Sequence, residues 1–413
     1  MFAVKWPPHC NFTNFANAKF VISVMNGLRK ILTTCLLMLL GCSMAMAIEL
    51  TPVTTGHLPV SDPGTLKRYT AFCGALNASY TVDIWFPEGY DAGSETRYPV
   101  IYMQDGQNLF DPSISFAKVA WEVDKALGRL IAAGEVTAPI IVGIHNRGVD
   151  RPADYIPEKP ITEYMNKHQQ TLSGMDAVTG GKYYGDEYAA FVATELKPAV
   201  DALFPTIPDR EHTFIMGSSM GALASLNAMC EYPDIYGGSG CLSTHWIGNF
   251  DSNSTIFPTA MLDYLQASLP SAASHKLYLD RGTKGLDAYY EKWENKAVEL
   301  AESKGYSQSA GSLYVYVAQG ADHNEYFWQQ RVDKALVFFL HNLSKDVSPV
   351  IDDDALLLTP VPGGVEILSS KGGTITVSDM QGKTQLLRVS PFTPTRLPLP
   401  SGLYVIGHRK IKL

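Results

Sequence analysis

The chain has 413 residues, of which 46% are hydrophobic and 18% charged, so it can bury a large core. Its net charge of -8, without a block of lysine and arginine, argues against a nucleic-acid partner. The length suggests two or three domains, although one α/β unit could take most of the chain.

The N-terminal region has the pattern of an export signal. Arg29 and Lys30 precede the short apolar run 31–40, and the small residues of "AMA", which ends at Ala47, match a cleavage site. The apolar run is too short for a membrane span. We therefore predict that residues 1–47 hold a signal peptide that is cleaved after Ala47 and delivers the protein to export machinery.

Two alternatives stay open in this region. The sequence "LLGC", which ends at Cys42, resembles a lipobox, and its cysteine would then carry a lipid anchor. Residues 1–24 fit neither kind of signal, so Met25 is an alternative start of the protein.

Three cysteines remain after the predicted cleavage, namely Cys73, Cys230 and Cys241. An odd count permits at most one disulfide, and no pair has the spacing of metal ligands. We expect all three to be small buried apolar residues.

Short apolar segments alternate with amphipathic ones through the middle of the chain. This alternation predicts a mostly parallel sheet covered by helices, an α/β fold, and the paired strands at 65–86 predict an antiparallel edge. The expected strands are 80–86, 98–103, 139–144, 213–216, 276–280 and 313–317. The expected helices are 119–134, 186–204, 222–233, 287–305 and 327–343.

The character of the sequence changes after Leu343. A polar linker, "SKDVSPVIDDD", is followed by short β-type segments with glycine turns and no helical periodicity. We predict an α/β domain over residues 48–345 and a small all-β sandwich over residues 346–413.

A candidate nucleophile lies between a predicted strand and a predicted helix. The sequence "GSSMG" places Ser219 at the centre of a G-x-S-x-G pattern, in which a strained turn projects the serine from the sheet edge. The alternative is a tight turn of small residues without chemistry. Ser218 is offset by one position and would point elsewhere.

A serine nucleophile needs a base, and His323 is the best placed histidine. It follows the last strand of the predicted sheet, and in α/β-hydrolases the histidine comes after the serine and the acid. The alternative is a solvated loop histidine. His245 follows the strand after Ser219, near the expected mouth of the site, and is a candidate substrate contact.

The acid of the triad is expected after the strand at 276–280. Asp280 ends that strand, and Asp287 follows a glycine-rich turn. Asp280 could instead pair with Arg281, and Asp287 could merely cap a helix. We favour Asp287, because the acid must reach the histidine from a loop.

The oxyanion hole needs two backbone donors, for which we predict the N–H groups of Met220 and Gln107, the latter in the turn after strand 98–103. Gln107 could also be an ordinary turn residue. The predicted substrate contacts, each of which could equally belong to the core or rim, are Tyr155, His245, Trp246 and Trp328.

Five motifs in order resemble the putative-esterase family of α/β-hydrolases, which includes enterochelin, feruloyl and acetyl-xylan esterases and mycolyltransferases. They are "YPVIYMQDGQNLFD", "GIHNRGVDRPADYIP", "GSSMGALAS", "LDRGTKGLDAYY" and "ADHNEYFWQQR". The resemblance implies a Ser–His–Asp triad of Ser219, His323 and Asp287, with no metal or organic cofactor. The acid position varies in this family, so Asp287 is the least secure of the three.

The C-terminal sequences "ITVSDMQGK" and "LPLPSGLYVIGHRKIKL" resemble the sorting domain of type IX secretion substrates. Together with the signal peptide, this resemblance implies secretion or display at the cell surface. We expect a secreted serine esterase that removes acetyl or feruloyl groups from polysaccharides. The alternatives are a siderophore esterase, an acyltransferase and a surface-binding module without activity.

Overall fold

The computed structural model describes residues 48–168, 174–251, 253–341 and 343, and then residues 356–412 apart from 362, 370–372, 380–383, 390–394, 401 and 407–408. The predicted signal peptide, Cys42 and the predicted boundary near residue 346 lie outside the described residues. Within the described ranges, no helix has the length and apolar character that a membrane crossing needs.

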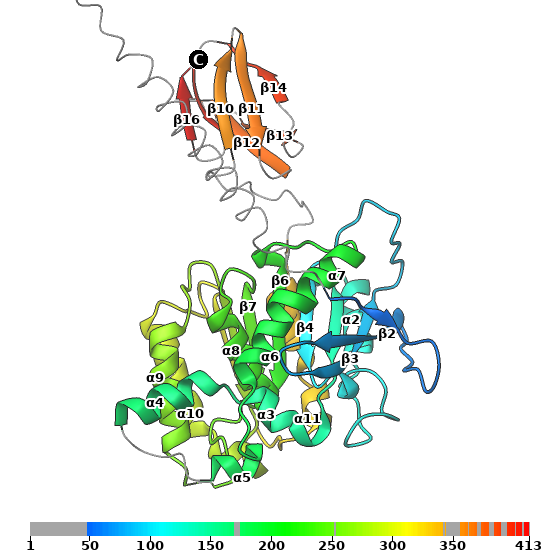
Figure 1. The fold of residues 1–413 in the computed structure, drawn as a ribbon, viewed down its shortest axis with the longest axis vertical. Coiled ribbons are helices and arrows are strands. Elements are labelled where there is room, and N and C mark those ends of the chain that lie inside the picture. Colours follow the sequence, from blue (N-terminus) through cyan, green and yellow to red (C-terminus); the bar gives the residue numbers. More distant parts are fainter. Residues whose placement is uncertain are drawn as a thin grey trace, which may run out of the picture. The chain divides into compact units, whose positions relative to one another are not determined.

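Strands β1 to β9 form one sheet in the order β1-β2-β3-β5-β4-β6-β7-β8-β9 (Figure 1). The strands from β5 to β9 in this order run parallel, while β1, β2 and β3 form the predicted antiparallel edge. The bounds are Thr51–Pro52 (β1), Thr65–Cys73 (β2), Ala78–Phe86 (β3), Val100–Gln104 (β4), Ile140–Ile144 (β5), Thr213–Ser218 (β6), Gly238–Leu242 (β7), Lys276–Arg281 (β8) and Leu313–Val317 (β9).

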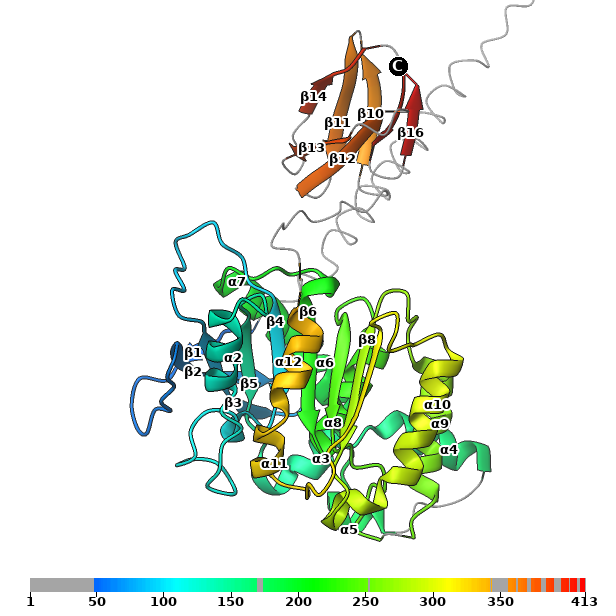
Figure 2. The same cartoon turned by 180° about the vertical axis from the view of Figure 1, so that it is seen from behind.

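Helices cover both faces of this sheet, which is why every residue of β4 to β7 is buried. Helices α6 and α8 lie over the face of the sheet that is turned forward in Figure 1. Helices α2 and α12 lie over the other face, which is turned forward in Figure 2. The helix bounds are Val123–Ala132 (α2), Arg151–Tyr155 (α3), Glu158–His168 (α4), Met175–Thr179 (α5), Gly185–Phe191 (α6), Lys197–Leu203 (α7), Met220–Glu231 (α8), Ile256–Ser268 (α9), Glu291–Ser303 (α10), Glu325–Gln329 (α11) and Val332–Leu340 (α12).

Three of the predicted helices differ from the observed ones. The helix expected at 287–305 begins only at Glu291, and the residues before it form a separate 3-10 helix, Gly285–Tyr289. The helix expected at 119–134 begins only at Val123, because the N–H of Trp121 bonds to the carbonyl of Asn108 and Glu122 has a φ of 52°. The helix expected at 327–343 is broken into α11 and α12 at Arg331, whose φ and ψ of -137° and 0° are not helical. These three differences place extra backbone turns near the edge of the sheet that carries Ser219.

The core below that edge joins the sheet to α2 and α12. It is a buried cluster that includes Met103 and Met216 of the sheet, Leu127 of α2 and Leu336 of α12. This packing holds the carboxyl ends of the parallel strands, from which the candidate site is built.

The C-terminal residues form two antiparallel sheets, in the orders β10-β11-β14 and β13-β12-β15-β16. One hydrophobic cluster takes side chains from both sheets, among them Val365, Ile375 and Ile406. The predicted all-β architecture is therefore confirmed. The strand bounds are Leu356–Val361 (β10), Gly364–Ser369 (β11), Gly373–Asp379 (β12), Thr384–Val389 (β13), Thr395–Pro398 (β14), Leu403–Ile406 (β15) and Arg409–Lys412 (β16).

Cys73, Cys230 and Cys241 are buried and unpaired, as expected for small apolar residues.

Candidate active site

Ser219 lies in a sharp turn between β6 and α8. Its φ of 58° and ψ of -124° are unusual for a residue with a side chain, and such strain concentrates at functional sites. Two backbone hydrogen bonds hold the turn. The N–H of Ser219 donates to the carbonyl of Leu242 at 2.9 Å, and its own carbonyl accepts from the N–H of His245 at 3.2 Å.

Close packing explains the two glycines that flank this turn. A Cβ atom on Gly217 would lie 2.8 Å from the backbone carbon of Gly221, and one on Gly221 would lie 2.9 Å from Cβ of Gln104. No side chain fits at either position. The two glycines of the G-x-S-x-G pattern are therefore required by the packing of the turn against β4.

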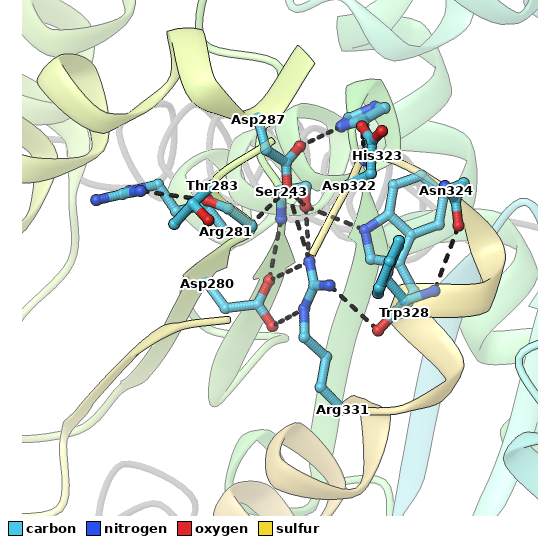
Figure 3. Close-up of polar contacts among 12 residues, drawn as sticks. Ser243, Asp280, Arg281, Thr283, Asp287, Asp322, His323, Asn324, Trp328 and Arg331 are labelled. Carbon is cyan, nitrogen blue, oxygen red and sulfur yellow. Dashed lines mark hydrogen bonds and ion pairs between the residues drawn. The ribbon is translucent and has the colours of Figure 1, made fainter. Parts of the chain in front are cut away.

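Three side chains from separate parts of the chain form one hydrogen-bonded series. Nε2 of His323 lies 2.8 Å from Oγ of Ser219, and Nδ1 of His323 lies 2.5 Å from Oδ1 of Asp287. An ionised carboxylate only accepts, so Nδ1 carries the hydrogen and Nε2 is free to accept the serine proton. Figure 3 shows Asp287 and His323 turned toward each other.

Asp287 is fully buried, in a 3-10 helix (Gly285–Tyr289) that follows β8. Its Oδ2 atom accepts from the N–H of Gly282 at 2.5 Å and from Oγ of Ser243 at 2.6 Å. Burial alone would raise the pKa of Asp287, but the hydrogen bonds from His323, Ser243 and Gly282 hold it below its ordinary value. The carboxylate therefore stays charged beside the imidazole.

Asp280, the other candidate acid, is bound by Arg331 (Figure 3). Its two oxygens accept from Nε and Nη2 of Arg331, both at 3.0 Å, and Oδ2 also accepts from Tyr278 at 2.8 Å. The partner of Asp280 is thus Arg331, at the start of α12. Arg281, the partner considered from the sequence, instead contacts Glu291 at 3.0 Å.

The turn after β4 holds Gln107 in a 3-10 helix (Gly106–Asn108). Asp105 has a φ of 56°, and its carboxylate accepts two bonds from Arg151, at 2.8 and 2.7 Å. A Cβ on Gly106 would lie 2.4 Å from the carbonyl carbon of Gly143, so this turn rests directly on β5. These contacts fix the backbone around Gln107.

Gln107 and Met220 lie at the same edge of the sheet, because they follow the adjacent parallel strands β4 and β6. Met220 is the first residue of α8, so its N–H has no acceptor within the helix. The side chain of Gln107 accepts from the N–H of Asn146 at 3.2 Å. The backbone N–H groups of Gln107 and Met220 are thus the predicted donors at this edge.

Two predicted substrate contacts are placed in the interior. Tyr155 and Trp246 have no exposed surface. The hydroxyl of Tyr155 accepts from the N–H of Asp105 at 3.1 Å, so this side chain supports the turn after β4 from behind. Their burial argues against direct contact with a substrate.

Trp328 and His245 lie beside the histidine of the series and are also buried. The rings of Trp328 and His323 meet edge to face, with 5.0 Å between their centroids. Nδ1 of His245 lies 2.6 Å from the hydroxyl of Tyr290. Burial, and then the positive charges of His323 and Arg151, lower the pKa of His245 to about 3, so it is neutral at ordinary pH.

Sequence reasoning missed several residues that support the site. Ser243 contacts Asp287, Arg331 pairs with Asp280, and Arg151 holds Asp105. A serine or arginine near a strand end carries no pattern of its own. Ser243 directly follows β7, and Asp287 lies in the segment after β8. Only the order of the strands, in which β7 and β8 are adjacent and parallel, would have predicted that these two segments lie side by side.

Among the residues that the structure describes, no group of three or more histidine, cysteine, aspartate or glutamate side chains is arranged to hold a metal ion.

Known proteins are similar in sequence to this chain over most of the α/β region. A family model described as "Putative esterase" matches residues 73–339. The uncharacterized protein YjcH of Bacillus subtilis (strain 168) is 26% identical over 277 residues, which cover 66% of this chain and 96% of that protein. An endo-1,4-beta-xylanase/feruloyl esterase of Xylanibacter ruminicola is 22% identical over 278 residues, which cover 66% of this chain and 31% of that protein.

Two solved esterase structures align with this chain. A ferulic acid esterase aligns with a TM-score of 0.49 and 19% identity, covering 67% of this chain and 98% of its own. The enterobactin esterase FES from Shigella flexneri aligns with a TM-score of 0.49 and 17% identity, covering 68% of this chain and 60% of its own.

Proposed function

Because the chain belongs to the putative esterase family and is a carboxylic-ester hydrolase, we propose that it cleaves esters through a triad of Ser219, His323 and Asp287. The observation that carries this proposal is the unbroken series of hydrogen bonds from Ser219 Oγ through the imidazole to a buried carboxylate. The strained turn at Ser219 supports it as well.

In the first half of the reaction, Oγ of Ser219 attacks the ester carbonyl while Nε2 of His323 takes the hydroxyl proton. The carbonyl oxygen becomes an oxyanion, which accepts hydrogen bonds from the N–H groups of Gln107 and Met220. His323 then gives its proton to the departing alcohol, and an acyl group remains on Ser219.

In the second half, a water molecule attacks the acyl-enzyme and loses its proton to His323. The second tetrahedral intermediate collapses, the carboxylic acid leaves, and the proton returns to Ser219. Asp287 keeps Nδ1 protonated throughout and stabilises the imidazolium that forms in each half.

We place the substrate among acylated polysaccharides that carry acetyl or feruloyl groups. Five large apolar side chains are strongly exposed on the segments of chain that follow β4, β5, β7, β8 and β9. They are Phe116, Val149, Phe250, Tyr289 and Tyr326. Segments that follow parallel strands begin at the same edge of the sheet as the turn of Ser219, and exposed apolar side chains on such segments are candidates for contact with a bulky ligand.

An ester panel tests this proposal. It contains acetylated xylan, feruloylated arabinoxylan, a cyclic catechoyl-serine trilactone and short 4-nitrophenyl esters. We expect acetyl or feruloyl release by the wild-type protein and a loss of about 10⁴-fold or more in kcat for Ser219→Ala and His323→Ala. Preferential hydrolysis of the trilactone would favour a siderophore substrate, and full activity of either folded variant would contradict the triad.

Export to the cell surface or medium is a second part of the proposal, based on the signal sequence and the C-terminal segment. Mass spectrometry of the N-terminus of the exported protein tests it. We expect the mature chain to begin at Ile48, whereas a lipid-modified N-terminus at Cys42 would identify an anchored lipoprotein.

A further inference from the structure

A buried polar network adjoins the proposed triad at Oδ2 of Asp287, the carboxylate oxygen that does not contact His323 (Figure 3). Its centre is the hydroxyl of Ser243, which directly follows β7. Oγ of Ser243 lies 2.6 Å from Oδ2 of Asp287, 2.7 Å from Nη2 of Arg331 and 3.0 Å from Nε1 of Trp328. These four residues come from three separate segments of the chain, because only Trp328 and Arg331 are close together in the sequence.

The chemistry of these neighbours fixes the direction of every hydrogen bond. A guanidinium and an indole N–H can only donate, so Arg331 and Trp328 occupy the two lone pairs of Ser243 Oγ. Its single hydrogen therefore points to the remaining neighbour, Asp287. The hydroxyl of Ser243 is thus an oriented donor to the carboxylate.

Arg331 is a second possible partner for Asp287. It is almost fully buried, and its Nη2 atom has two hydrogens, one on Asp280 at 3.0 Å and one on Ser243 at 2.7 Å. The same nitrogen lies 3.9 Å from Oδ2 of Asp287. The hydroxyl of Ser243 thus takes up the guanidinium hydrogen that lies nearest to the proposed triad acid.

The backbone holds Ser243 in this place. Its N–H donates to the carbonyl of Asp280 at 2.7 Å, and its φ of 44° lies in the left-handed region. A positive φ is unfavourable for serine and favourable for glycine. The position therefore combines a side chain that contacts Asp287 with a backbone that glycine would adopt more easily.

We infer that Ser243 is a positioning residue of the triad: its hydroxyl orients Asp287 toward His323 and keeps Arg331, which lies 3.9 Å from that carboxylate, from forming a direct hydrogen bond with it. The inference rests on the proposed function of Ser219, His323 and Asp287. Without the hydroxyl, the freed guanidinium hydrogen turns to Asp287 Oδ2, and the bond from Asp287 to His323 weakens.

The test is the variant Ser243→Gly, which removes the hydroxyl at a position where glycine suits the backbone. We expect kcat for a 4-nitrophenyl ester to fall about 10- to 100-fold with KM unchanged, as is typical when a residue that orients a catalytic group is removed. The acid limb of the kcat/KM profile should move to lower pH, because a less supported imidazole is protonated less readily.

Two further variants separate the effect of the Ser243 hydroxyl on kcat from the effect of a substitution on the stability of the protein. Ser243→Ala also removes the hydroxyl but keeps the unfavourable φ, so it should match Ser243→Gly in kcat while being less stable. Ser239→Ala is the matched control, since Ser239 is a buried serine of β7 whose Oγ lies 3.4 Å from Sγ of Cys241. It should retain the wild-type kcat.

Wild-type kcat in Ser243→Gly, a loss of kcat with an unmoved acid limb, or activities that follow stability across the variants would each overturn the inference. These outcomes leave the esterase proposal intact, because the wild-type protein remains active in all of them. An inactive wild-type protein would instead overturn the proposed function on which the inference depends.

Discussion

Oδ1 of Asp287 lies 2.5 Å from Nδ1 of His323, and no part of that carboxylate is exposed to solvent. We predict that Asp287→Asn lowers kcat by about 10³- to 10⁴-fold, because an amide can donate to Nδ1 and so favour the wrong imidazole tautomer. Steady-state kinetics of the folded variant, with its fold checked by circular dichroism, measures this loss.

Asp280→Asn is the matched comparison, because Asp280 is equally buried on the same segment of chain. It leaves Arg331 without its full counter-charge, and we expect a loss of about 3–5 kcal/mol in the free energy of unfolding. The kcat of its folded fraction should fall less than that of Asp287→Asn. The reverse order would assign the acid of the triad to Asp280.

The turn that carries Gln107 provides a second prediction. A Cβ atom on Gly106 would lie 2.4 Å from the carbonyl carbon of Gly143, so Gly106→Ala must displace this turn. If the N–H of Gln107 binds the oxyanion, kcat should fall by about 10²- to 10³-fold. Gly74→Ala is the control, because its Cβ would meet nothing within 4 Å. Equal kcat in the two variants would exclude Gln107 as a donor.

His245 should make stability depend on pH. Its pKa in the folded protein is about 3, lowered by burial and by the charges of His323 and Arg151, whereas an unfolded histidine titrates near about 6.5. Between these values the unfolded chain binds the extra proton, so stability is full above about pH 6.5 and falls as the pH is lowered.

The free energy of unfolding should fall by about 1.4 kcal/mol for each pH unit below the pKa of the unfolded histidine, which amounts to about 2 kcal/mol at pH 5. Chemical denaturation of the wild-type protein and of His245→Gln at pH 7.5 and pH 5 measures it. The variant should lose less stability between these conditions, and identical losses would show that His245 does not contribute.

The nucleophile turn could be predicted from sequence because local packing dictates it. Gly217 and Gly221 approach other atoms too closely for side chains, and the flanking strand and helix have clear apolar patterns. The parallel sheet could also be predicted, because short apolar segments alternate with amphipathic ones along the chain. A short stretch of sequence therefore contained both the turn and the residue at its centre.

The acid could not be settled in this way, because Asp280 and Asp287 both follow the same run of strand residues. The choice depends on tertiary partners. Arg331, which lies 51 positions after Asp280 in the sequence, binds Asp280. Asp287 is therefore the aspartate that contacts His323. The sequence likewise left open whether Tyr155 and Trp246 line the site or belong to the core, since nearness to a strand end does not reveal whether a side chain turns outward or is buried, and both are buried.

Covalent labelling by a fluorophosphonate probe tests the central claim most directly, since only an activated serine reacts. Ser218→Ala is the control for Ser219→Ala, because Ser218 is the buried neighbour at the end of β6. Intact-mass analysis should find one adduct on the wild-type protein and on Ser218→Ala, and none on Ser219→Ala. An adduct on Ser219→Ala, or a folded wild-type protein that stays unlabelled, would contradict the account.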